Sequence, residues 1–239
     1  MNNKVGEFYG IGVGPGDSEL ITLKALRIIK SVDCIFAPRA DSKGSSLALD
    51  IVSDVCEGKR VVEQVYPMVK DKSQLETAWL ASANEIKREL DAGNSVAYLT
   101  IGDPLTFSTY CYLLQQLSKI IPSQKIHTIP GITSYNAAAS LANFSLIEQS
   151  EKLAIIPVSS NIDELRSVLN SFDTVILMKV AKKLDEVIEL LEDMDLVDNS
   201  LFASYIGHEN EFITRDLLSL KGVGKGYLSV IIVRKPVHT

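Results

Sequence analysis

The residues of this sequence that are best suited to ligand chemistry lie in three loops rich in glycine and proline. The first loop, residues 9–17, follows an apolar run and contains four glycines and Pro15. Glycines at this density allow positive φ angles and let the backbone approach a ligand closely. A dinucleotide-binding fingerprint, G-x-G-x-x-G, would need a glycine where the chain has Pro15 or Asp17. The loop therefore either binds a ligand other than a pyrophosphate or is a tight turn that ends a strand.

The second and third loops also follow apolar runs and precede helical patterns. The second contains Gly102, Asp103 and Pro104, and the third, residues 129–135, contains Thr133 and Ser134. Asp103 suits either a helix N-cap or a charge-assisted hydrogen bond to a polar or cationic small molecule. The two hydroxyl residues of the third loop are good N-caps as well. Three loops of one kind, taken together, favour a small-molecule site over three unrelated turns.

Apolar runs that alternate with amphipathic stretches predict the elements that position these loops. The alternation is typical of an α/β protein, in which helices cover the faces of mostly parallel or mixed sheets. Ligands of such sheets bind beyond the carboxyl ends of the strands, where all three loops fall. We predict strands at residues 7–13, 33–37, 60–65, 95–101, 126–129, 153–158, 174–180 and 201–206, a late strand pair within 212–220 and 227–235, and helices at 18–30, 45–55, 73–90, 106–117, 133–141, from 163 onwards and at 184–194.

The pattern breaks once, at residues 121–124, where Pro122 follows a predicted helix. It restarts at about residue 125 with a new strand. We therefore expect two lobes, residues 1–122 with the first two loops and residues 123–239 with the third.

Composition and charge exclude several classes of partner. The chain has 239 residues, of which 46% are hydrophobic, and a formal net charge of -6. An acidic chain without a basic run does not fit a nucleic-acid binder, and no apolar run approaches the roughly 20 residues that span a bilayer. The first residues lack the pattern of a signal peptide, and three scattered cysteines and three histidines fit neither a disulfide framework nor a metal site. These features predict a cytoplasmic protein that binds no nucleic acid, membrane or metal.

The three loops resemble those of the tetrapyrrole (corrin/porphyrin) methyltransferases of cobalamin, sirohaem and porphyrin biosynthesis. The likeness rests on GIGVGPGD, LTIGDPLTFSTY and IPGITSYNAAAS and extends over essentially the whole chain. The segments FAPRA, SLALDIV and EKLAIIPVS are most similar to the members that methylate C20 of precorrin-2 or cobalt-factor II. The resemblance implies a two-lobed α/β fold with the active site in the cleft between the lobes, and a homodimer. It also implies S-adenosylmethionine as methyl donor and S-adenosylhomocysteine as product.

The resemblance further implies which residues bind the methyl donor. Pro15 would lie at the floor of the cleft, and residues 101–103 would hold the methionine and ribose parts of the donor. Met178 would lie near the adenine, although a methionine in a strand is as often a core residue. The positions around Gly207 depart from the Glu-Asn-Gly pattern of the uroporphyrinogen-III enzymes. The full implied set is Pro15, Ile101, Gly102, Asp103, Thr106, Thr133, Ser134, Met178, Ile206, Gly207 and Ser229.

For methyl transfer to such a substrate, the protein has to align the acceptor carbon with the methyl group and needs little covalent chemistry of its own. The meso carbon between two pyrrole-derived rings is already electron-rich, and alignment at a reacting distance of about 3–3.5 Å supplies roughly 7–11 kcal/mol of the barrier. We predict no catalytic nucleophile. The group that accepts the proton lost from the methylated carbon is open among Tyr110, His208, Glu209 and water.

The tetrapyrrole has eight carboxylates, so a local cation must bind it on this acidic chain. Arg39, expected in a loop after the second strand, is our first choice, and a surface arginine beside Asp41 is the alternative. Such a hydrogen bond to a charged group contributes about 1.5–3 kcal/mol. Tyr110 is expected either to contact the substrate or to pack in the wall of the cleft.

Other functions fit the same features. They are a uroporphyrinogen-III methyltransferase or an enzyme for another ring position, a diphthine synthase, a ribosomal-RNA methyltransferase, and a regulatory nucleotide-binding module without catalysis. Whether the tetrapyrrole carries cobalt is also open at this stage.

Overall fold

A computed structural model of the chain describes residues 6–39, 44–66, 71–158, 161–224 and 227–236. The chain divides into two compact units, Met1–Thr133 and Ser134–Thr239. This division differs from the boundary at 122/123 expected from the sequence. The reason is strand β5 (Ile126–Ile129), which pairs with strand β1 in the first sheet instead of opening the second unit.

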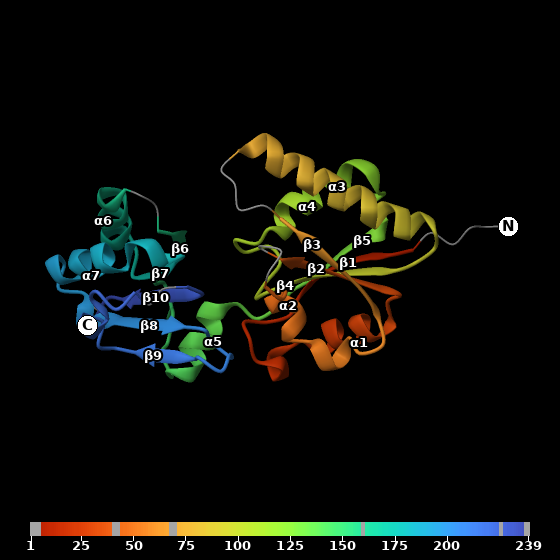
Figure 1. Ribbon diagram of the computed structural model, residues 1–239. Helices are drawn as coiled ribbons and strands as arrows, with labels where there is room; N and C mark the ends of the chain where they lie inside the picture. The colour runs from red at the N-terminus through yellow and green to blue at the C-terminus, as the bar shows by residue number, and fades with distance from the viewer. Residues whose placement is uncertain (1–5, 40–43, 67–70, 159–160, 225–226, 237–239) are drawn as a thin grey trace. The chain divides into compact units, whose positions relative to one another are not determined.

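The first unit is built on a parallel five-stranded sheet in the order β3-β2-β4-β1-β5 (Figure 1). The central strand β4 is buried along its whole length, as expected for an apolar run that is covered on both faces. In the register of the sheet, Gly12 of β1 lies opposite Thr100 of β4, and Ile11 lies opposite Ile129 of β5. The three glycine- and proline-rich loops therefore leave the same edge of the sheet side by side. The strands are β1 (Phe8–Gly12), β2 (Cys34–Arg39), β3 (Arg60–Val65), β4 (Val96–Thr100) and β5 (Ile126–Ile129).

Helices cover both faces of this sheet (Figure 1). Alternate strand residues supply two separate cores, because successive side chains of a strand point to opposite faces. Ile35 and Leu99 pack with α1 and α2, whereas Phe36 and Tyr98 pack with α3 and α4. The helices are α1 (Leu23–Ser31), α2 (Leu47–Asp50), α3 (Lys72–Asp91) and α4 (Tyr110–Ile120).

Two helices of the first unit begin later than the sequence pattern predicts. In the segment 18–30, a short 3-10 turn precedes Thr22, whose extended backbone and side-chain hydroxyl cap α1 through a 3.1 Å hydrogen bond. In the segment 106–117, Phe107 has a φ of +51°, which no α-helix tolerates, so α4 begins only after it. The loop that follows β4 is therefore longer than expected.

The second unit is built on a mixed five-stranded sheet in the order β6-β7-β10-β8-β9. Only β6 and β7 are parallel neighbours among the described strand pairs of this sheet. The late strand pair expected from the sequence is β9 and β10, but the two do not pair with each other, because β8 lies between them. The elements are α5 (Ser134–Leu141), β6 (Leu153–Pro157), α6 (Ile162–Ser171), β7 (Thr174–Met178), α7 (Leu184–Asp193), β8 (Ser200–Ser204), β9 (Phe212–Thr214) and β10 (Ser229–Arg234).

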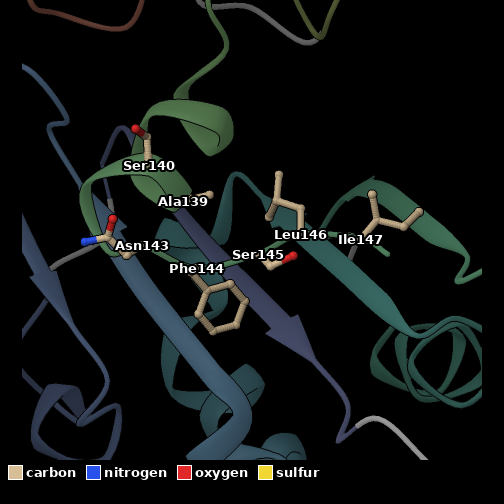
Figure 2. Close-up of a pocket in the computed structure, with 7 residues that line it drawn as sticks. All are labelled: Ala139, Ser140, Asn143, Phe144, Ser145, Leu146 and Ile147. Atoms are coloured by element: carbon tan, nitrogen blue, oxygen red, sulfur yellow. The ribbon is translucent and has the colours of Figure 1, made fainter. Parts of the chain in front are cut away.

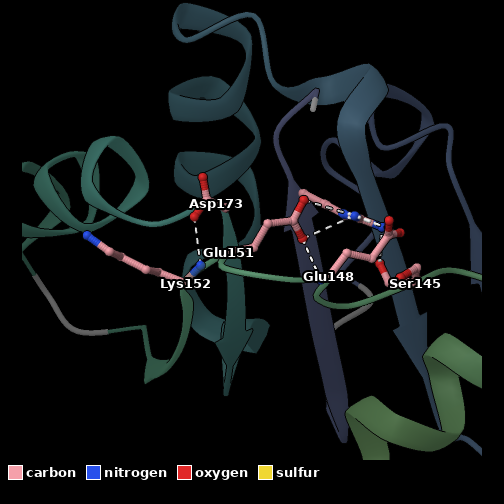
Figure 3. A network of polar contacts seen from close by, with 6 residues as sticks. Ser145, Glu148, Glu151, Lys152 and Asp173 are labelled. Atoms are coloured by element: carbon pink, nitrogen blue, oxygen red, sulfur yellow. Dashed lines mark hydrogen bonds and ion pairs between the residues drawn. The ribbon is translucent and has the colours of Figure 1, made fainter. Parts of the chain in front are cut away.

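Helices α6 and α7 cover one face of the second sheet with a core of aliphatic side chains (Figure 1). At the end of β10, the guanidinium of Arg234 donates to the carboxylates of Glu148 (3.0 Å) and Glu151 (3.1 Å) and to the carbonyl of Ser145 (3.0 Å) (Figure 3). This network fastens the segment between α5 and β6 to the sheet. The prediction of an α/β fold with two mostly parallel or mixed sheets and flanking helices is confirmed, and the structure shows that the first sheet is parallel and the second mixed.

Among the described residues, no helix is both long and apolar enough to cross a membrane. Over the same ranges, no three side chains of the metal-binding types form a cluster.

Candidate functional site

The first two loops are joined by direct backbone hydrogen bonds. The amide of Gly102 donates to the carbonyl of Gly14 at 2.7 Å, and the amide of Gly14 donates back at 3.4 Å. Gly14 has a φ of +85° and Gly102 a φ of +66°, and a residue with a side chain rarely adopts such angles. The amide of Val13 also donates to the carbonyl of Thr100 at 2.9 Å. The loop that precedes Pro15 is thus fixed against the loop that contains Asp103.

The third loop packs against the other two through glycine. A Cβ added to Gly12 would lie 2.4 Å from the carbonyl oxygen of Gly102, and a Cβ added to Gly131 would lie 2.1 Å from the same atom. Only glycine fits at either place, because the neighbouring atoms are backbone. The three loops therefore form one compact group, which we call the three-loop cluster: residues 12–15, 101–106 and 129–133.

Asp103 ties this cluster together with its side chain. One carboxylate oxygen accepts from the amide of Leu105 (2.9 Å) and the hydroxyl of Thr106 (3.3 Å), and the other accepts from the amide of Gly131 (3.2 Å). A carboxylate has about four acceptor positions, so these three donors leave room for one more. Asp103 does not cap α4, because the amide of Tyr110 at the start of that helix is bonded to Ser108 (3.1 Å).

The remaining first-unit residues of the implied set, and Ser134 at the start of the second unit, lie in or next to the cluster. Pro15 is buried directly after the Gly14 bridge, and Ile101 is half-buried against the core beneath α1 and α2. Thr133 and Ser134 are half-buried at the end of the third loop and the start of α5.

Two residues that the sequence analysis does not single out also shape the second loop. The hydroxyl of Ser108 lies 2.8 Å from that of Thr100 at the end of β4. Phe107 has a positive φ and is 41% exposed. The run of hydroxyl residues 106, 108 and 109 is the sequence signal for the first feature, whereas nothing in the residue type of Phe107 indicates the second.

Tyr110 lies in the core of the first unit. Its ring covers Gly10, where an added Cβ would lie 2.1 Å from the ring, and its hydroxyl is 2.7 Å from that of Thr128. The side chain is fully buried, and burial raises the pKa of the phenol above its usual value. The structure therefore supports neither the substrate-binding role nor the proton-accepting role considered for Tyr110.

Arg39 is the last residue of β2 and not part of a loop, contrary to the expectation from the sequence. Its guanidinium lies 2.5 Å from the carboxylate of Glu63 on the neighbouring strand β3, and its side chain is 21% exposed. Nε of Arg39 is buried and has no hydrogen-bond partner among the described residues. Asp41, the alternative partner, lies outside them.

Apart from Ser134, the second-unit residues of the implied set meet at one edge of the second sheet. Met178 at the end of β7 lies opposite Val230, and Ser229 at the start of β10 lies opposite Ser204 at the end of β8. Residues 206 and 207 follow β8 directly, and the amide of Gly207 donates to Glu211 at 2.8 Å. The sequence places these residues far apart, and the strand order brings them together.

A cavity of about 500 Å³ opens beside this edge. Its wall contains three aromatic side chains and Glu211. His208, one of the candidate proton acceptors, lies three residues before Glu211 in the sequence and is half-buried. Glu209, another candidate, is exposed. The lining residues are Ser204, Tyr205, Asn210, Glu211, Phe212, Gly224 and Tyr227.

A second hollow of about 510 Å³ lies beside the end of α5 and is open to solvent (Figure 2). Its wall is formed by residues 139, 140 and 143–147. None of these residues belongs to the set implied by the resemblance.

Comparison with known proteins places these loops in a family. The family model of the tetrapyrrole (corrin/porphyrin) methylases matches residues 7–221, which include the three-loop cluster and strands β6 to β9 of the second sheet. The chain belongs to this family. The tetrapyrrole methylase resemblance inferred from the loop sequences is thereby confirmed.

Relatives within the family are similar over most of the chain. A probable cobalt-precorrin-2 C(20)-methyltransferase of Methanocaldococcus jannaschii is 37% identical over 195 residues, which cover 82% of this chain and 81% of the relative. The cobalt-precorrin-2 C(20)-methyltransferase of Salmonella typhimurium is 32% identical over 232 residues, with 96% and 97% covered. The crystal structure of uroporphyrin-III C-methyl transferase from Thermus thermophilus, complexed with S-adenyl homocysteine, superposes with a TM-score of 0.66 at 19% identity over 96% of this chain and 98% of that one. The last comparison shows a shared fold.

Proposed function

We propose that this tetrapyrrole methylase transfers a methyl group from S-adenosylmethionine to C20 of precorrin-2 or cobalt-factor II in cobalamin biosynthesis. The observation that carries the proposal is the 32% identity to the Salmonella typhimurium enzyme over nearly the full length of both chains. The intact three-loop cluster supports it, since the backbone hydrogen bonds between Gly14 and Gly102, and the bond from the amide of Gly131 to the carboxylate of Asp103, fix the loops that would hold the donor.

The residues of the three-loop cluster fit the methyl donor by their chemistry. Asp103 keeps one acceptor position for a donor group of the ligand, and a carboxylate suits the ammonium or ribose hydroxyls of S-adenosylmethionine. Half-buried Ile101 offers an apolar contact next to it. When bound, the sulfonium supplies an electrophilic methyl group. The protein then has to orient the acceptor carbon and keep water away.

The other proposed donor-binding residues in the first unit are Pro15, Thr106 and Thr133, and Ser134 follows them as the first residue of the second unit. The rest of the proposed contribution of the second unit comes from the edge of its sheet, from Met178, Ile206, Gly207 and Ser229.

Substrate binding is proposed to use Arg39. A guanidinium binds carboxylates with two parallel hydrogen bonds, and the side chain of Arg39 is 21% exposed. Glu63 holds the guanidinium in place and shares its charge. The substrate carboxylate would approach the same group.

The reaction is tested with S-adenosylmethionine labelled with carbon-13 at the methyl group. The protein is incubated with precorrin-2, with cobalt-factor II and with uroporphyrinogen III in parallel, and carbon NMR locates the label. Label at C20 of precorrin-2 or of cobalt-factor II supports the proposal and shows whether the substrate carries cobalt. Label on uroporphyrinogen III alone assigns the chain to the uroporphyrinogen-III methyltransferases and refutes it.

We further propose a cytoplasmic homodimer. The three cysteines are free thiols, and two of them, Cys34 and Cys56, are buried, as is usual in a reducing compartment. Light scattering coupled to size exclusion tests the dimer: a mass near twice 26.2 kDa supports it, and a mass near 26.2 kDa refutes it. Cell fractionation tests the location.

A further inference from the structure

The second loop of the three-loop cluster is closed at its base by a pair of hydroxyl groups. Residues 101–108 leave the sheet after Thr100, the last residue of β4, and end at Ser108, just before α4. The side-chain hydroxyls of Thr100 and Ser108 lie 2.8 Å apart and share a hydrogen bond, which we call the neck of the loop. The Ser108 hydroxyl also accepts a 3.1 Å bond from the amide of Tyr110, and its carbonyl accepts a 3.3 Å bond from the amide of Cys111. Ser108 therefore joins the end of β4 to the first turn of α4.

The neck involves a hydroxyl that is buried in the first unit. Thr100 is 6% exposed, and its side chain points to the same face of the sheet as that of Tyr98, which packs with α3 and α4. A buried hydroxyl has to find a hydrogen-bond partner, and here that partner is Ser108. A valine would fill the space of Thr100 without needing a partner, so packing alone does not account for the pair.

The neck acts against a strained residue of the loop. Phe107, directly before Ser108, has a φ of +51°, in the left-handed region that a residue with a side chain rarely adopts. Such a conformation persists only where the surrounding structure fixes it. The neck fixes the residue that follows Phe107, and the thiol of Cys111 donates to the carbonyl of Pro104 at 3.5 Å. When the neck is lost, the strain favours opening of the loop.

The shape of this loop determines where the carboxylate of Asp103 lies. Two of the groups that bond to this carboxylate, the amide of Leu105 and the hydroxyl of Thr106, belong to the same loop. The third, the amide of Gly131, belongs to the third loop. Opening of the neck separates these groups and moves the remaining acceptor position of Asp103. A displacement of about 1 Å is enough to weaken a site that depends on positioning.

From these contacts we infer that Ser108 is a positioning residue, whose bond to Thr100 holds the second loop in the shape that binds the methyl donor. The inference rests on the proposed function, which assigns Asp103 and its neighbours to that donor. The effect is a population shift, because the apparent affinity is the intrinsic affinity multiplied by the fraction of molecules in which the loop is closed. Loss of the neck lowers this fraction and leaves the groups that contact the methyl donor unchanged.

The test compares five variants by calorimetric titration with S-adenosylhomocysteine, by urea unfolding and by steady-state kinetics with the tetrapyrrole that the wild type methylates. Ser108→Ala and Thr100→Val each remove one hydroxyl of the neck, and a double variant removes both. If one of the two single variants does not fold, the other carries the test. Thr100→Ser keeps the hydroxyl and loses only a methyl group. Tyr110→Phe is the matched control, because it removes one hydroxyl from another pair of the first unit, 2.7 Å from the hydroxyl of Thr128.

We expect the affinity for S-adenosylhomocysteine to fall about tenfold in Ser108→Ala and in Thr100→Val, the loss of one hydrogen bond. The KM for S-adenosylmethionine rises by the same factor. The turnover number at a saturating concentration of the methyl donor stays within about twofold of the wild type, since the bound donor keeps the loop closed. The double variant loses no more affinity than either single variant, because all three lack the same bond. Thr100→Ser keeps the wild-type affinity, and Tyr110→Phe keeps it although its urea midpoint falls.

Three results overturn this inference and leave the proposed function intact. A wild-type affinity in folded Ser108→Ala or Thr100→Val shows that the neck serves stability alone. Losses of affinity that add in the double variant show that the two hydroxyls act separately. An equal loss in Tyr110→Phe shows that any hydroxyl removed from this unit has the same effect. A wild type that neither binds S-adenosylhomocysteine nor methylates a tetrapyrrole overturns the proposed function, and the inference with it.

Discussion

Replacing Gly131 with alanine is expected to force apart the backbone contacts that join the three-loop cluster. The new Cβ would lie 2.1 Å from the carbonyl oxygen of Gly102 and 2.9 Å from Cα of Gly12, whereas ordinary contact begins at 3.4 Å. All these neighbours are backbone atoms, so no change of rotamer relieves the clash. Since protein interiors are close-packed, the loops have to separate by about 1 Å.

The cost of that separation follows from the contacts it breaks. Overpacking a close-packed site costs about 1–3 kcal/mol, and weakening the 2.7 Å hydrogen bond from Gly102 to Gly14 adds about 1 kcal/mol. We expect the free energy of unfolding of Gly131→Ala to fall by about 2–4 kcal/mol. Displacing the groups that position a substrate by about 1 Å can slow the reaction about 100-fold, so we expect turnover to fall on the order of 100-fold.

Urea unfolding, titration with S-adenosylhomocysteine and the methylation rate measure these effects. Gly58→Ala is the control, because its Cβ would meet no atom within 4 Å although its φ is +74°. That variant should lose about 1–2 kcal/mol from the left-handed backbone alone and keep its affinity for the ligand. A folded Gly131→Ala with wild-type affinity and turnover would refute the reasoning.

Three further predictions concern single side chains. Tyr110→Phe should lower the free energy of unfolding by about 1 kcal/mol by removing one hydroxyl pair, with no change in the KM for the tetrapyrrole; a raised KM would restore a substrate role. Arg39→Ala should raise that KM about tenfold and leave the affinity for S-adenosylhomocysteine unchanged, and equal losses of both would argue against a substrate contact. Hydrogen bonds from Lys125 and His127 lower the pKa of Glu7 below 4.5, so its contribution to stability is present above that pH and is lost as the pH falls through the folded pKa. Urea midpoints of wild type and Glu7→Gln should therefore differ at pH 6 and converge as the pH falls through the folded pKa of Glu7, and a constant difference would contradict this.

The loops of the site are predictable from the sequence because their chemistry is local. Glycine, proline and aspartate directly after an apolar run indicate a loop at the end of a buried strand, and all three such loops are found where they were expected. The contacts between the loops are less accessible to sequence reasoning. Asp103 bonds to Gly131 across 28 positions of sequence, and that pairing depends on the strand order β4-β1-β5.

The differences between expectation and structure have the same origin. Strand β5 has no local feature that assigns it to the first sheet, and β9 and β10 look like neighbours because only a short segment separates them in the sequence. Tyr110 follows the second glycine- and proline-rich loop, but the late start of α4 turns its ring over Gly10 and into the core. The left-handed backbone of Lys179, with a φ of 60°, could not be predicted from the sequence, because lysine is an ordinary residue in a turn.

The account depends most on the three-loop cluster as the place where the methyl donor binds, and calorimetric titration with S-adenosylhomocysteine tests this directly. We predict saturable binding to the wild type, and at least about tenfold weaker binding to a folded Asp103→Ala, which loses a charged acceptor. Absence of binding to the wild type, or equal affinity of the two proteins, would contradict the account.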